Sequence, residues 1–200
     1  MTQWVESAEG GRDRGPRAVL RAWFEVATAP SRFYRTGVAP GDQAPGLTFA
    51  MLVVLVAEAT RFALVPDAYP VIADSELLSG ALWLGVAVLL VAPAGLHLLA
   101  AVETLLLAAL APDRGGVSET VQVLGYATAP CVFAGIPTPE VRAVCGVYAF
   151  ALLVVGVGVV HRVSTWRAFV LSLVPGVVAY GYGFRALAAI ETLLRNWFII

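Results

Sequence analysis

The chain has 200 residues, of which 59% are hydrophobic and 14% are charged. Soluble domains contain about 45–50% apolar and about 25% charged residues, so this composition excludes an ordinary soluble domain and favours transmembrane segments. The formal net charge of −1 indicates no particular class of partner, and the chain has no pattern typical of nucleic-acid binding. The sequence therefore predicts a small all-α membrane protein with no nucleic-acid partner.

The N-terminal region combines a polar tail with an amphipathic helix. Residues 1–16 are small, polar and charged, which predicts a disordered tail. Over residues 17–35, a helical wheel that turns about 100° per residue gathers the charged side chains in one sector, opposite Trp, Phe and Leu. The arginines of that sector are Arg17, Arg21, Arg32 and Arg35. This pattern favours an interfacial helix on an anionic inner leaflet, although a helix packed on a soluble partner would share it.

A proline interrupts the amphipathic helix, and a linker follows it. Pro30 lacks a backbone N–H and is predicted to kink or split the helix. Residues 37–46 contain two prolines and three glycines, which is typical of a linker. The predicted organisation is therefore a tail at 1–16, a surface segment at 17–46 and a transmembrane domain at 47–200.

Five long apolar stretches follow the linker, and each predicts a transmembrane helix. They cover residues 47–65, 80–111, 120–136, 142–160 and 166–189. The second exceeds the roughly 20 residues that a span needs, so it must tilt or project, and Pro93 is predicted to bend it. The predicted fold is an all-α polytopic membrane bundle of five transmembrane helices plus the N-terminal amphipathic interfacial helix.

The distribution of arginine predicts the orientation of these spans. With the N-terminus inside, the inner segments hold nine arginines, whereas the outer loop 66–79 holds no basic residue and three acidic ones. We therefore predict a multi-pass protein of the cell membrane with its N-terminus in the cytoplasm and its C-terminus on the far side.

The third predicted span, 120–136, is interrupted by glycine and proline. Gly125 removes a side chain and lets a neighbouring helix approach closely. Tyr126 is expected near the inner side, where its hydroxyl can reach headgroups or a partner. Pro130 removes one backbone donor, so we expect a kink and a freed carbonyl that must find a donor within the protein. Pro137 ends the segment.

The span interrupted by glycine and proline, together with residues that follow it, resembles a known family. The matching features are Gly125-Tyr126, Pro130, Ile136-Pro137, Val147-Tyr148, Gly156, His161, Ser164 and Arg167-Ala168. With five spans and a cytoplasmic N-terminal region, they resemble the Yip domain family, named for Ypt/Rab-interacting protein one. The resemblance covers roughly residues 29–198 and implies a prokaryotic-type five-span integral membrane protein. The Asp-Leu-Tyr-Gly-Pro element of eukaryotic members is missing, so a Rab-type GTPase partner is not expected.

Charged side chains inside the predicted spans are functional candidates because they are costly in lipid. Glu58 and Arg61 lie three residues apart on one helical face, which predicts an ion pair. His97 and Glu103 lie six apart and do not share a face. A structural pair facing the bundle and a proton or ion relay through these residues are both open at this point.

The chain contains no HExxH, GxSxG or P-loop motif. We therefore predict a non-enzymatic protein without cofactors or a metal site. The resemblance favours a membrane-organising or protein-interaction scaffold, with the bilayer, membrane-protein partners or its own copies as partners. The alternative is a small transporter or lipid-handling protein that uses Glu58 and Arg61.

Overall fold

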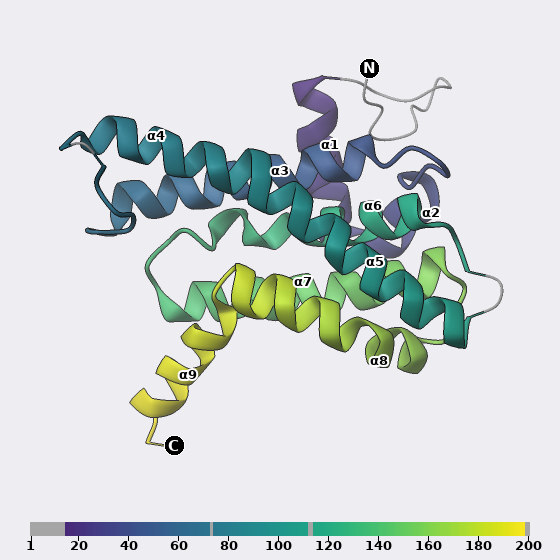
Figure 1. The fold of residues 1–200 in the computed structure, drawn as a ribbon. Helices are drawn as coiled ribbons and strands as arrows, with labels where there is room; N and C mark the ends of the chain where they lie inside the picture. The colour runs from purple at the N-terminus through teal and green to yellow at the C-terminus, as the bar shows by residue number, and fades with distance from the viewer. Residues whose placement is uncertain (1–14, 73, 112–113, 199–200) are drawn as a thin grey trace.

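Two short helices separated by a proline open the described part of the protein. A computed structural model describes residues 15–72, 74–111 and 114–198, and the regular elements in these ranges are helices (Figure 1). Helix α1 (Pro16–Thr28) ends just before Pro30, and α2 (Pro30–Thr36) begins at it. The predicted split at Pro30 is confirmed, because proline cannot continue the first helix but fits the first position of the next.

Long apolar helices make up the body of the fold. They are α3 (Ala44–Leu64), the continuous run of α4 (Glu76–Val86), η1 (Ala87–Val91) and α5 (Ala92–Leu110), and α7 (Pro139–Val160). All three are long and apolar enough to cross a membrane, and the second has 35 residues. Its π-helical turn η1 lies just before Pro93, where the missing N–H disturbs the α-helical hydrogen-bond ladder.

The segment expected as the third span consists of two short helices, α6 (Val117–Ala127) and the 3₁₀ helix η2 (Ala129–Phe133). Pro130 lies in the first turn of η2, so the predicted kink takes the form of a change from α to 3₁₀ geometry. Each residue from 120 to 131 is buried. Neither helix is long enough to span a membrane alone, but together they run along the bundle beside α3 and α7 (Figure 1).

The C-terminal part contains a sharp bend. Helix α8 (Thr165–Gly176) continues into the π-helical η3 (Val177–Gly183), and α9 (Ala186–Asn196) leaves at 73° to this pair. The predicted fifth span, 166–189, therefore runs through the bend, where Arg185 has a left-handed φ of 64°. The described residues thus contain three candidate spans, or up to four if this bent pair counts as one.

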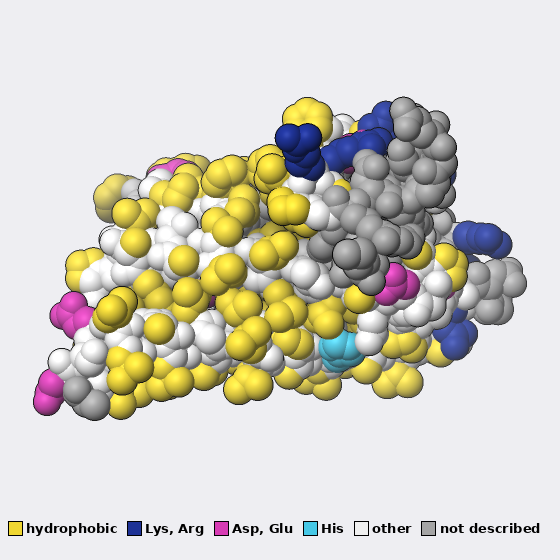
Figure 2. Space-filling view, turned by 90° about the horizontal axis from the view of Figure 1, so that it is seen from above, with side chains coloured by type: hydrophobic (Ala, Val, Ile, Leu, Met, Phe, Trp, Pro, Cys, Tyr) yellow, Lys and Arg dark blue, Asp and Glu magenta, His cyan; other side chains and the backbone are white. Residues whose placement is uncertain are grey.

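On the face of the bundle seen in Figure 2, hydrophobic side chains cover most of the surface and the visible basic side chains lie toward one end. On α5, for example, Leu105 is 71% exposed. Exposed leucine and valine continue along α3, α7 and α8. A surface this apolar suits lipid tails and would be unfavourable in water.

Candidate functional site

The broken segment α6–η2 is the centre of the bundle, and glycine lets α3 approach it. A Cβ atom placed on Gly125 would lie 2.3 Å from the carbonyl oxygen of Gly46. A Cβ placed on Gly46 would lie 2.4 Å from Cα of Gln122. Backbone meets backbone here, as at the small-residue interfaces of membrane helices. Gly125 thus has the role expected of it, a contact between helices.

The carbonyl groups around the break receive hydrogen bonds from side chains of other elements or of the break itself. Tyr180 donates to the carbonyl of Leu124 at 3.1 Å, Thr128 to that of Gly125 at 2.7 Å, and Trp23 Nε1 to that of Ala129 at 2.8 Å. A break in a helix inside lipid is tolerated only when such groups are satisfied by the protein. The break is therefore built from three parts of the chain, including the N-terminal helix α1.

Tyr126 of the broken segment and Pro137, which follows that segment, lie in contrasting surroundings. Tyr126 is fully buried, and its ring packs edge-on against Phe33 at a centroid distance of 4.7 Å and against Phe49 at 5.2 Å. Its ring is therefore held by α2 and α3 inside the bundle. Pro137 lies exposed in the turn that leads into α7.

Glu58 lies between two arginines near the C-terminal end of α3. Its carboxylate is 3.2 Å from Nη1 of Arg61, the partner expected from the sequence, and 2.8 Å from Nη1 of Arg185. Arg142 lies close enough to interact electrostatically with this group, and its Nε donates to the carbonyl of Ala134 at 3.0 Å. Sequence reasoning missed Arg185, because 127 positions separate it from Glu58 and only folding brings the two together.

His97 and Glu103 bond to different parts of the bundle. Nδ1 of His97 lies 2.7 Å from the carbonyl oxygen of Pro93 in its own helix. Glu103 is fully buried and accepts a hydrogen bond of 3.4 Å from the hydroxyl of Ser172 in α8. The second carboxylate oxygen, Oε2, has no hydrogen-bond partner among the described residues. The described contacts do not connect these two residues to each other or to Glu58.

Comparison with known proteins agrees with this architecture. The sequence profile of the Yip1 domain matches residues 24–185. The chain belongs to the Yip1 domain family. No curated protein and no solved structure matches the chain. The matched region of the Yip1 domain contains the broken segment α6–η2 and extends as far as Arg185, the second partner of Glu58.

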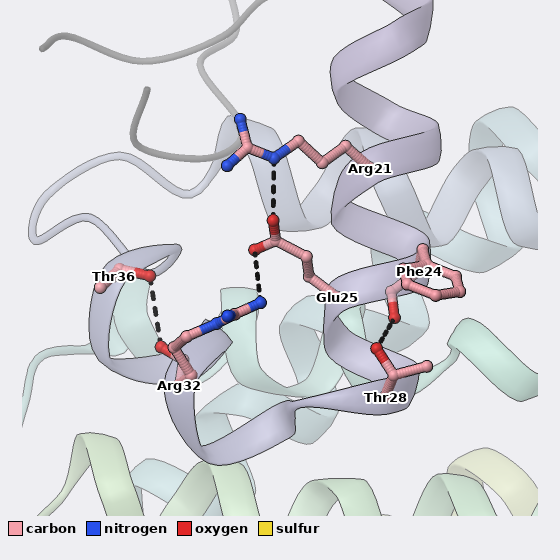
Figure 3. A network of polar contacts seen from close by, with 6 residues as sticks. All are labelled: Arg21, Phe24, Glu25, Thr28, Arg32 and Thr36. Atoms are coloured by element: carbon pink, nitrogen blue, oxygen red, sulfur yellow. Dashed lines mark hydrogen bonds and ion pairs between the residues drawn. The ribbon is translucent and has the colours of Figure 1, made fainter. Parts of the chain in front are cut away.

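Most of α1 precedes the region matched by the Yip1 domain, yet α1 is tied to that domain. Glu25 of α1 accepts a hydrogen bond from Nε of Arg21 at 2.8 Å, and Arg32 of α2 lies 4.0 Å from the same carboxylate (Figure 3). Hydroxyl groups of Thr28 and Thr36 bond to carbonyls of their own helices (Figure 3). Of these two ion pairs, the one between Glu25 and Arg32 spans the turn at Pro30. The stronger tie of α1 to the domain is the hydrogen bond from Trp23 to the carbonyl of Ala129.

The exposed face of α1 mixes basic and apolar side chains. Ala18, Ala22 and Val26 form its buried face. Leu20 and Phe24 are exposed, as are all four arginines expected at the lipid surface, namely Arg17, Arg21, Arg32 and Arg35. Figure 1 shows α1 running across the direction of the long helices. If the long helices cross a membrane, α1 therefore lies roughly in its plane.

Proposed function

We propose that this Yip1 domain protein is a non-enzymatic scaffold that organises membrane or binds protein partners at its surface. The observation that supports this most is the engagement of the family-motif residues inside the bundle. Gly125 contacts the backbone of α3, and the carbonyls around Pro130 bond to side chains from within the protein. Partners would therefore bind to the outside of the bundle.

The proposed setting is the cell membrane, with the arginine-rich end at the anionic cytoplasmic leaflet. Arginine attracts anionic lipid, and an exposed Leu20 and Phe24 beside Arg21 suit the headgroup boundary. Counting α6–η2 and the continuous α8–η3 as crossings gives the proposed five passages, with the C-terminus outside. Its partners would be membrane proteins or further copies of the chain, and neither nucleic acid nor a Rab-type GTPase.

Cysteine labelling in intact cells tests this placement. Pro70→Cys lies in the loop before α4, and Val163→Cys in the turn between α7 and α8. An impermeant maleimide should label the first in intact cells and the second only after permeabilisation. The unsubstituted protein is the control, because Cys131 and Cys145 are both buried. The reverse labelling pattern would show that the proposed orientation is wrong.

Affinity purification in a mild detergent tests the scaffold role. Specific membrane proteins should purify with the tagged chain, and an unrelated tagged membrane protein of similar size identifies non-specific partners. Flux driven by a pH gradient in proteoliposomes, lost in Glu58→Gln, would instead favour the small-transporter function. Retained lipid without any protein partner would favour lipid handling.

A further inference from the structure

A hollow of about 540 Å³ opens at the arginine-rich end of the bundle. Three segments that are distant in the sequence surround it, and each contributes one arginine. Arg35 comes from α2, Arg114 precedes α6, and Arg162 lies in the turn between α7 and α8. Val159 and Val160, at the end of α7, add apolar wall. The hollow lies within the size range of small-molecule sites, about 300–1,000 Å³.

The hollow carries positive charge that the described residues do not neutralise. No carboxylate of the described residues lies within ion-pair distance of its three arginines. Glu119 also lines the hollow, but its carboxylate accepts a hydrogen bond of 2.6 Å from the hydroxyl of Ser118 in the first turn of α6. Three arginines and one glutamate leave two positive charges facing this space.

The backbone and the wall of the hollow add two further observations. Arg162 has a φ of 55°, a left-handed conformation that is unfavourable for arginine. Strained residues of this kind concentrate at ligand sites, where the surrounding structure holds them. Tyr34 also lines the hollow, and because its side chain is only 2% exposed it contributes a rigid part of the wall.

We propose that this hollow binds a phosphate group, supplied by an anionic phospholipid headgroup or by a free phosphate. Guanidinium groups bind phosphate oxygens with paired, charge-assisted hydrogen bonds, and three of them from different segments can surround one group. The apolar wall suits the carbon atoms that adjoin the phosphate of a lipid. That a lipid headgroup supplies the phosphate rests on the proposed placement of this end at the cytoplasmic leaflet. The affinity of the three arginines for phosphate does not depend on that placement.

Calorimetric titration of the full-length protein in detergent tests the proposal. The two probes are inorganic phosphate and dihexanoyl phosphatidylglycerol, each titrated separately. We expect saturable binding of at least one probe. Arg114→Gln and Arg162→Asn should each weaken it about tenfold, a typical loss for one charge-assisted contact. Asparagine is chosen at position 162 because it tolerates the left-handed conformation.

Arg167→Gln is the matched control, because Arg167 is exposed at the same end of the bundle but does not line the hollow. It removes the same charge and should leave binding unchanged. Binding of phosphatidylglycerol alone would identify a headgroup site, and binding of inorganic phosphate alone would identify a free-anion site. Absence of binding, or an equal loss in Arg167→Gln, would overturn the proposal. The scaffold role has a separate readout, the co-purifying proteins, so either idea can fail without the other.

Discussion

The contact between Gly125 and Gly46 gives the sharpest test of how the bundle is held together. In Gly125→Ala the new methyl group would lie 2.3 Å from the carbonyl oxygen of Gly46 and 2.7 Å from its carbonyl carbon. Ordinary contact begins at 3.4 Å, so α3 and α6 would have to separate by about 1 Å. Both atoms in the way belong to backbone, which cannot rotate aside as a side chain can.

The expected loss of stability follows from two opposing effects. Overpacking of a well-packed interior costs about 1–3 kcal/mol, and the upper value applies where backbone must move. Alanine recovers about 1 kcal/mol through its better helix propensity than glycine. Gly125→Ala should therefore reduce the free energy of unfolding by about 2 kcal/mol. A chain of this size loses about 2–4 °C of melting temperature per kcal/mol, which gives about 4–8 °C.

Thermal unfolding in detergent micelles, followed by circular dichroism, measures this loss. Gly95→Ala is the matched control, because Gly95 lies in α5 and a Cβ there would meet nothing within 4 Å. The control should be neutral or stabilising by up to about 1 kcal/mol, since only the propensity changes. If the two variants melted at the same temperature, close packing of α3 on α6 would not explain Gly125.

Two further predictions concern charge. Glu58 is 13% exposed in its side chain and bridges Arg61 and Arg185, so Glu58→Gln should destabilise the protein by about 1–3 kcal/mol by leaving both arginines unpaired. Removing Arg185 as well should recover part of that loss in a double-mutant cycle, and additive losses would contradict the bridge. Burial lowers the pKa of His161 from 6.5 to about 4. The unfolded chain then binds a proton first, so the contribution of His161 to stability should fall by up to about 3 kcal/mol as the pH drops from 6.5 to 4, and this contribution should not change above pH 6.5. His161→Gln should remove this slope, and an unchanged slope would assign it to other groups.

The bridge at Glu58 also changes what the sequence suggested about this residue. A pair confined to α3 would make Glu58→Gln nearly silent for folding. The second partner, Arg185, lies where η3 bends into α9, so the carboxylate links two distant parts of the chain. The two ion pairs therefore give Glu58 a structural role, and the flux experiment tests a relay separately.

Local sequence was sufficient to predict several features of the fold. The runs that became α3, α4–α5 and α7 were recognisable because lipid requires helices with internally bonded backbone and apolar side chains. The division at Pro30 and the break near Pro130 followed from a missing N–H. The glycine and proline residues around Gly125 and Pro130 also indicated the family. The match of the Yip1 domain to residues 24–185 confirms it.

Other features depended on how the helices pack. The sequence predicted single spans at 120–136 and 166–189, whereas the first is a buried pair of short helices and the second bends by 73°. Hydropathy reports only the transfer of a segment into an apolar medium, and a segment inside the bundle scores like one facing lipid. The partner of Glu58 at Arg185 and the meeting of Arg35, Arg114 and Arg162 are contacts between distant segments. The sequence by itself determined the class, the family, the local breaks and the pairing of Glu58 with Arg61, while tertiary packing decided which charges from distant segments meet and where a hollow forms.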